Sequence, residues 1–251
     1  SIAGITATGA LTLTSGGAIT QSGALQVTGD STFANTAGTN AAITLGDSNN
    51  AFNGKVTFDT DAGSAVTITD ATSLELETLS AASLNVTSGG AVTDGGTLAI
   101  TGATSISASG QSITLDDTAS TFGSLVLTGA DVAITEADAT HLGSSSVTGS
   151  LTITSSGEVT DTGTLTVGGV TTISASGQNI TLDDASSTFG SLSLTGENVA
   201  VTENADMELA ASTISGTATF NSSGNAVSDS GTLTIGGTTT INAGTATLTL
   251  D

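Results

Sequence analysis

The sequence predicts an all-β fold, a right-handed parallel β-helix (β-solenoid) with three short strands in each coil of about 22 residues. Three observations predict it: a long internal repeat, strict alternation of apolar and polar residues inside each copy, and a composition dominated by small and β-branched residues. An antiparallel sandwich gives no reason for a long repeat, whereas a solenoid needs each coil to fit the coils on either side.

The repeat is clearest in two nearly identical stretches of twenty residues. ISASGQSITLDDTASTFGSL begins at Ile106, and ISASGQNITLDDASSTFGSL begins 67 residues later at Ile173, with three differences. A further copy beginning at Ala218 carries one inserted residue. We therefore predict a single solenoid segment, 1–251, with superrepeats at approximately 11–83, 84–150, 151–217 and, in part, 218–251.

Within one copy the strands follow from the period of two. In SLNVT (83–87), Leu84 and Val86 face one side of the strand and Asn85 and Thr87 face the other. The copy 84–150 contains nine such segments, in order LNVT, AVTD, LAIT, SISA, ITLD, LVLT, VAIT, LGSS and SVTG, separated by Gly, Asp and Ser turns. Three strands in each coil then make three coils in each superrepeat, and about eleven coils in the chain.

The core is expected to be narrow and filled by stacked aliphatic side chains. Pro, Cys, Trp and Tyr are absent, Gly reaches 33 and aromatic residues are 2%. Each phenylalanine occupies a place where other copies of the repeat carry an apolar residue. The core-packing residues predicted from this pattern are Phe52, Phe122, Phe189, Ile106 and Ile173.

The charge excludes several classes of function. One Lys stands against 23 Asp and Glu, for a formal net charge of −22. Nucleic-acid phosphates and anionic membrane surfaces are bound mainly by Lys and Arg, so we expect no nucleic-acid partner. No apolar run approaches the roughly 18 residues of a membrane-spanning helix, and we expect no membrane insertion. Self-repulsion among the acids should weaken as salt or divalent cations are added.

Two acidic pairs, Asp116–Asp117 and Asp183–Asp184, are the candidate metal ligands. Paired carboxylates are typical of Ca²⁺ sites, but adjacent strand residues point to opposite faces, and equivalent pairs should lie three coils apart, about 14 Å. These pairs are therefore weak Ca²⁺ candidates, at most nonspecific, and a solvated turn after ITL is the alternative. We expect no other cofactor.

The sequence offers little for catalysis. Carboxylate pairs occur in glycosidases, but Lys55 is the one cationic side chain apart from the lone His141. No phosphate-binding glycine motif opens a helix. We therefore expect no catalytic and no cofactor-binding residues, and no enzymatic activity.

The run ITLDD…TFGSLVLTGADVAITEAD…LGSSSVTGSLTITSSGEVTDTGTLTVGG resembles the β-strand repeats of filamentous-haemagglutinin-like proteins, which are large secreted bacterial adhesins and exoproteins. The resemblance covers approximately Ile5 to Asp251 and rests on composition and pattern. It implies a right-handed β-helix at the bacterial cell surface or outside the cell. It carries over no catalytic residue.

The leading functional hypothesis is a structural, acidic, extracellular β-solenoid: the stalk or repeat region of a bacterial surface adhesin or of a secreted fibrous protein. The alternative is a self-assembling extracellular filament or surface-layer subunit, whose partner is the chain itself, end to end or laterally. A glycan-binding or carbohydrate-active β-helix is less favoured, because no Trp or Tyr is present to stack on a sugar. An ice-binding face is also less favoured; it would need outward threonine pairs such as Thr152/Thr154, Thr164/Thr166 and Thr247/Thr249 on every coil of one face.

Overall fold

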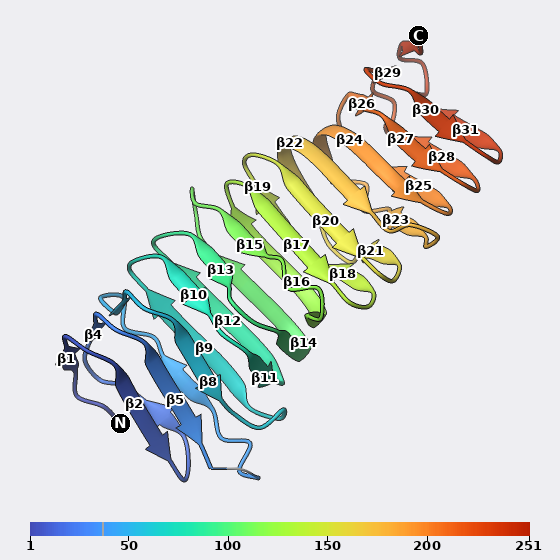
Figure 1. The fold of residues 1–251 in the computed structure, drawn as a ribbon. Coiled ribbons are helices and arrows are strands. Elements are labelled where there is room, and N and C mark those ends of the chain that lie inside the picture. The colour runs from blue at the N-terminus through green and yellow to red at the C-terminus, as the bar shows by residue number, and fades with distance from the viewer. Residues whose placement is uncertain (37) are drawn as a thin grey trace. The chain divides into compact units, whose positions relative to one another are not determined.

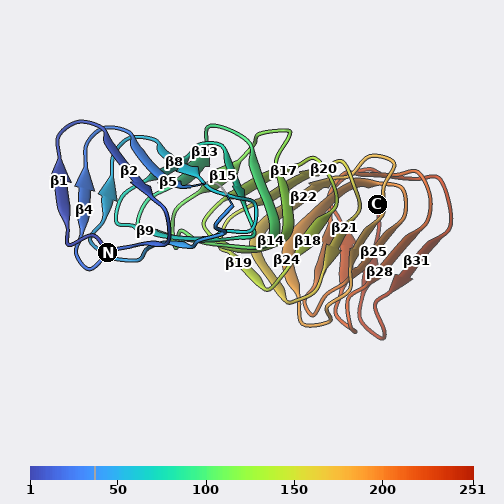
Figure 2. The same ribbon diagram turned by 90° about the horizontal axis from the view of Figure 1, so that it is seen from below.

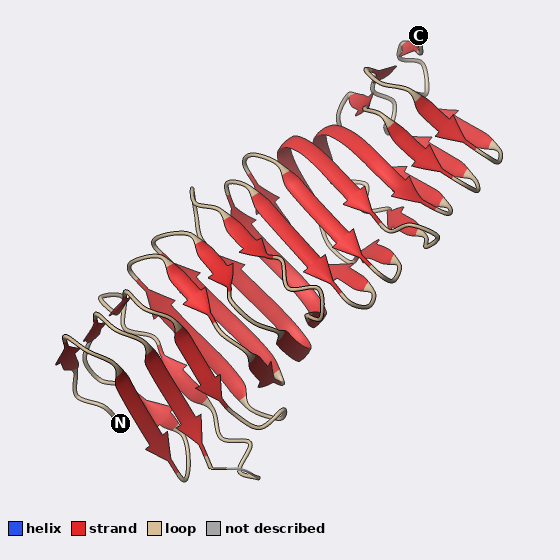
Figure 3. Ribbon diagram, viewed as in Figure 1, coloured by secondary structure: helices blue, strands red, loops and turns tan. Residues whose placement is uncertain are grey.

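The computed structural model describes residues 1–36 and 38–251, and these residues form an all-β protein without a helix (Figure 3). Its parallel strands stack as a β-solenoid of about 12 turns, which confirms the predicted fold class. No described segment is a helix long and apolar enough to cross a membrane. The chain divides into two compact units, residues 1–129 and 130–251, and each is described by itself.

The first unit contains the strands drawn in blue to green in Figure 1, and each pairs in parallel with strands of neighbouring turns. They are β1 (Ile5–Ala7), β2 (Leu11–Ser15), β3 (Ile19–Thr20), β4 (Leu25–Val27), β5 (Ser31–Asn35), β6 (Ile43–Leu45), β7 (Ala51–Phe52), β8 (Val56–Asp59), β9 (Ala65–Asp70), β10 (Leu74–Leu76), β11 (Leu79–Ala81), β12 (Ser83–Ser88), β13 (Val92–Asp94), β14 (Leu98–Ser107), β15 (Ile113–Leu115) and β16 (Thr121–Gly129).

The second unit continues in green to red and has the same parallel pairing. Its strands are β17 (Val132–Glu136), β18 (Thr140–Leu142), β19 (Ser145–Val147), β20 (Leu151–Ser155), β21 (Val159–Asp161), β22 (Leu165–Ser174), β23 (Ile180–Leu182), β24 (Thr188–Gly196), β25 (Val199–Thr202), β26 (Met207–Leu209), β27 (Ser212–Ile214), β28 (Ala218–Asn221), β29 (Val227–Asp229), β30 (Leu233–Ile235), β31 (Thr239–Asn242) and β32 (Leu248–Thr249).

Three strands complete one turn, as the registers of the second unit show. β20 stacks on β17 and β21 stacks on β18, while the first half of β22 stacks on β19. The second half of β22 then stacks on β20, so one turn has closed. Residues stacked on one another lie 17 to 22 positions apart in this unit, as in Leu192 on Leu209 and Thr166 on Thr188. The turns are thus shorter on average than the predicted 22 residues, and the chain makes about 12 of them.

The 67-residue superrepeat does not equal three turns. From β17 to its counterpart β25, all of whose residues are described, the chain passes through ten strand segments, because β22 and β24 each bend into two. Ten segments at three to a turn make 3⅓ turns. Equivalent strands therefore lie on neighbouring faces: β20 belongs to the column of β17, whereas its counterpart β28 follows β21, β23 and β25 in the next column.

The prediction of nine strands and three coils in each superrepeat was therefore wrong. The missing segment is the first part of β16 in one copy and of β24 in the other. In the former, Phe122 is a single apolar residue between Thr121 and Gly123, so alternation could not reveal a strand there. The last two predicted strands also lie earlier in the chain than expected, at β18 and β19.

The core of each unit lies inside that unit's own stacked turns (Figure 2). Most buried residues are Leu, Ile, Val and Phe, and a smaller set of buried polar residues, mainly Ser and Thr, lies among them. The rings of Phe33 and Phe52 meet edge to face at 5.8 Å, and Phe33 stacks on Phe58 at the same centroid distance. The core-packing residues named from the sequence are all buried: Phe52, Ile106, Phe122, Ile173 and Phe189.

A glycine corner lets one strand turn into the next without leaving the ladder. The register of β22 with β24 shifts between Val167 and Val170, at Gly168 and Gly169. Gly190 of the following turn lies so close that a Cβ placed on it would meet the carbonyl oxygens of Gly168 and Gly169 at 2.5 and 2.7 Å. This corner therefore excludes a side chain because of the backbone of the turn beneath it.

We expect Gly190→Ala to destabilise the second unit by about 1–3 kcal/mol, since the backbone must shift to admit the methyl group. Thermal and urea unfolding followed by circular dichroism measure the effect. Gly46→Ala is the control, because a Cβ there has nothing within 4 Å. Equal stability of the two variants would contradict the close approach.

Candidate functional sites

The acidic turn after β23 is held by a carboxylate of the preceding turn. Asp161, at the end of β21, accepts hydrogen bonds from the backbone N–H groups of Asp183 (2.9 Å) and Asp184 (3.4 Å). The same arrangement stands in the first unit, where Asp94 accepts from Asp116 (2.9 Å) and Asp117 (3.3 Å). Each acidic pair is thus fixed through its backbone by a third aspartate.

The two members of each pair have different roles. Asp184 bonds within its own turn, accepting from the N–H of Ser186 at 2.8 Å, and Asp117 does so from Ala119 at 2.9 Å. Asp116 and Asp183 are exposed. The described residues contain no group of three or more His, Cys, Asp or Glu side chains that could hold a metal ion. The weak Ca²⁺ candidates lie directly after β15 and β23, and Ca²⁺ binding by them stays a prediction.

Burial acts on the carboxylate that holds the turn. Desolvation raises the pKa of Asp161, the N–H groups of Asp183 and Asp184 lower it, and the negative charges of those residues raise it again. The net direction is upward. The pKa of Asp94 is raised for the same leading reason, its desolvation. The carboxylate of Asp161 therefore stabilises the acidic turn through the two hydrogen bonds that it accepts from backbone N–H groups.

A second buried carboxylate lies where β25 ends. Glu203 is fully buried, and its Oε2 accepts a hydrogen bond from the backbone N–H of Phe189 at 3.0 Å. In the first unit, Asp70 occupies the corresponding strand end, also buried, and accepts from the N–H of Phe52 at 3.3 Å. Sequence reasoning missed both, because the donor belongs to the preceding turn.

The remaining ionisable candidates have surface contacts. Lys55 lies on the exposed side with Glu77 Oε1 at 2.5 Å and Glu75 Oε1 at 3.5 Å from its Nζ. Hydrogen bonding to Glu77 raises the pKa of Lys55. His141 on β18 is partly exposed, and its Nδ1 lies 2.8 Å from Thr160 Oγ1.

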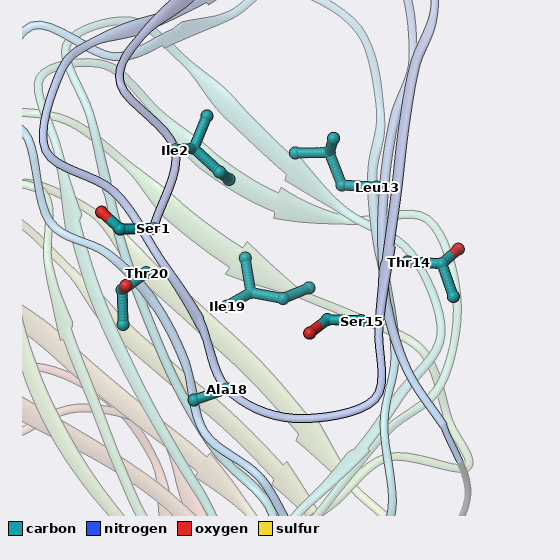
Figure 4. A pocket seen from close by; sticks show the side chains of 8 residues that line it. All are labelled: Ser1, Ile2, Leu13, Thr14, Ser15, Ala18, Ile19 and Thr20. Atoms are coloured by element: carbon teal, nitrogen blue, oxygen red, sulfur yellow. The ribbon is translucent and has the colours of Figure 1, made fainter.

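The described residues bound hollows of about 130 to 330 Å³, and the one of about 330 Å³ lies beside Asp229 and Asp251. A cavity of about 130 Å³ lies at the first turn (Figure 4), where Ile2, Leu13 and Ile19 point toward one another and Thr14 points away. A polar groove of about 210 Å³ crosses β23, β25 and β28, and includes Asn179 and Asn198, which are joined by a 3.0 Å hydrogen bond. The hollow at the first turn is lined by both apolar and polar residues, and the groove across β23, β25 and β28 has no aromatic wall.

Outward-facing threonines stack in a column, but this column does not contain the threonine pairs considered for an ice-binding face. Along β18, β21, β23, β25, β28 and β31 the stacked outward residues are His141, Thr160, Thr181, Ala200, Thr219 and Thr240. Thr152 and Thr154 lie on β20, in the column of β17, whereas Thr166 lies on β22 in the column of β19. The pair Thr152/Thr154 therefore lies on a different face from Thr166.

The geometry defines a parallel β-solenoid built from a degenerate sequence repeat. The family described as repeats of unknown function (DUF5649) matches residues 1–59, 63–128, 129–195 and 196–251, and the chain belongs to this family. No curated protein and no solved structure matches the chain.

Removing the carboxylate at Asp161 should leave two N–H groups of the acidic turn without an acceptor. We expect Asp161→Ala to cost about 1–3 kcal/mol and to speed amide hydrogen exchange at residues 183 and 184. Asp183→Ala, which removes an exposed carboxylate from the same turn, should leave both quantities nearly unchanged. The reverse order of the two variants would contradict this role.

Salt should stabilise the fold by screening the acidic surface. We expect the melting temperature to rise with added NaCl, and CaCl₂ at equal ionic strength to give a further rise from its divalent charge alone. Asp116→Asn combined with Asp117→Asn should keep the extra effect of Ca²⁺. Loss of that effect in the double variant, with the NaCl response intact, would instead indicate a specific Ca²⁺ site at this turn.

Proposed function

We propose that the chain is a structural, extracellular β-solenoid, the stalk or repeat region of a bacterial surface adhesin or of a secreted fibrous protein. The observation that supports it best is the use of polar groups. In the acidic turns, the side-chain carboxylate of one turn accepts backbone N–H groups of the next turn. At the glycine corner, the absence of a Cβ lets successive turns approach each other closely. A spacer or stalk requires this kind of architecture, in which each turn contacts its neighbours.

The same contacts argue against an enzyme. The two carboxylates that most resemble a catalytic pair have different contacts: Asp184 accepts a hydrogen bond from the backbone of its own turn, whereas Asp183 is exposed to solvent. Asp161 accepts backbone N–H groups and is not available to a substrate without opening that turn. We therefore propose a role without catalysis and without a resident cofactor.

An extracellular location is supported by the composition. The chain has no cysteine, and a chain that must cross membranes unfolded gains from having no thiols to cross-link. The acidic surface disfavours binding to nucleic acid and to anionic lipid. The partners proposed are a cell-surface or glycan receptor reached through other parts of an adhesin, or further copies of the chain.

The alternative function is a filament or surface-layer subunit that assembles end to end or laterally. Parallel ladders favour it in principle, because a turn of one copy could extend the sheet of another. Electron microscopy of the purified chain separates the two. Uniform single-chain particles support the stalk, whereas fibres with an axial spacing of about 4.8 Å support the subunit.

Location is tested on intact cells of the source organism. We expect antibodies raised against the purified chain to label unpermeabilised cells or the culture medium, and surface protease to remove that signal. A cytoplasmic protein serves as the control and must stay unlabelled until the cells are permeabilised. Labelling that appears only after permeabilisation would overturn the extracellular proposal.

A further inference from the structure

Glu203 joins three successive turns of the second unit. Its Oε2 accepts the N–H of Phe189 from the preceding turn, and its own N–H donates to the carbonyl of Asn221 in the following turn at 3.0 Å. The next residue, Asn204, donates its N–H to the carbonyl of Ser187 at 2.8 Å. We call these residues, 187–189 with 203 and 204, the Glu203 corner.

The surroundings of the Glu203 carboxyl group offer little to stabilise a negative charge. Glu203 is fully buried, and Oε1 has no hydrogen-bond partner among the described residues. A buried carboxylate needs several donors to offset the loss of water, and here there is one. The strands packed around it, β24, β25 and β28, contain no ionisable side chain that could supply a positive charge.

Burial accordingly raises the pKa of Glu203 to about 7, against the single backbone hydrogen bond from Phe189, which lowers it. The negative charge of Asp206, three residues on, raises it further. Two acids of the same region, Asp183 and Asp184, lie in the turn before β24 and are held by Asp161. Glu208 on β26 is exposed.

Asp70 is an internal comparison from the first unit. Its Oδ1 accepts from the N–H of Phe52 and from both the N–H and the hydroxyl of Thr72, the latter two at 3.0 Å. Desolvation raises the pKa of Asp70 as well, but hydrogen bonds from Thr72, Phe52 and Ala71 lower it. Glu203 occupies the corresponding position with one hydrogen-bond donor, so a negative charge on Glu203 is stabilised less than one on Asp70.

We propose that the Glu203 corner is a pH-sensitive contact, closed while the carboxyl is neutral and loosened when the carboxyl becomes charged. The neutral group keeps the hydrogen bond from Phe189 and the packing of the corner. The charged group is stabilised by water, which reaches it only if β24 and the segment after β25 move apart. This inference is independent of the proposed stalk function.

The direction of the effect follows from proton binding. Between the ordinary glutamate value of 4.5 and about 7, the closed corner holds a proton that the opened corner has released. Closure is therefore complete below pH 4.5 and is progressively lost as the pH rises through 7. The opening constant should increase on the order of 30-fold between pH 5.5 and pH 8.

Two measurements test the proposal on the whole chain. The carboxyl carbons of ¹³C-glutamate-labelled protein are titrated by NMR, and Glu203→Gln identifies the signal of residue 203. Amide hydrogen exchange of Phe189, corrected for its intrinsic pH dependence, reports opening of the corner. His141→Gln is introduced in every variant so that the chain contains no imidazole.

We expect the Glu203 signal to titrate near neutrality, and Phe189 to lose protection on the order of 30-fold between pH 5.5 and 8. Glu203→Gln should make that protection independent of pH, Asp206→Asn should shift the change to lower pH, and Glu208→Gln should leave it in place. Titration of Glu203 below pH 5, or equal pH dependence with and without its carboxyl, overturns the proposal. The titration of Glu203 decides even if Glu203→Gln does not fold.

Discussion

The structure depends on one constraint: each turn must present its backbone N–H and C=O groups in register to the turns on either side. An unpaired buried backbone group costs about as much as a lost hydrogen bond, so deviations are compensated locally. At the glycine corner the register shifts, and the two turns can still approach closely because Gly190 has no Cβ. Where a backbone N–H has no carbonyl of the neighbouring turn to donate to, a side-chain oxygen is the acceptor instead. Ser187 Oγ accepts a hydrogen bond from the N–H of Leu165, and the carboxylate of Asp161 accepts hydrogen bonds from two N–H groups of the acidic turn.

The same constraint explains what the sequence could predict. Alternation reveals strands that bury one face, and the recurrence of Ile106 at Ile173 reveals that turns must match; both were sufficient for the fold class. The segment around Phe122 has no alternation, so the tenth strand and the 3⅓ turns could not be found. Asp161 and Glu203 escaped notice for a different reason, since their donors lie 22 and 14 residues away and only the register brings them together.

A repeat of 3⅓ turns has a consequence for the outer surface. Equivalent residues within the second unit move to the next face with each superrepeat, rising about 16 Å along the stack. A surface that binds one extended partner along a single face needs the same residue in one column for many turns. Here the outward column of the second unit runs His141, Thr160, Thr181, Ala200, Thr219 and Thr240. The row of threonines is interrupted at Ala200 and is therefore not uniform. This arrangement favours a spacer over a flat recognition face.

Stacking alone does not explain an acid at Glu203. Asp70 and Glu136, at the equivalent places in earlier copies of the repeat, are also buried acids, but two other strand ends carry serines. Their hydroxyls satisfy the corner without ionising: Ser155 donates to the carbonyl of Asp138, and Ser88 donates to those of Thr72 and Gly90. A buried carboxyl whose pKa is about 7 weakens the fold at neutral pH compared with such a neutral group. The acid is therefore the less stable choice for a corner that must only be filled, and the property it adds is sensitivity to pH.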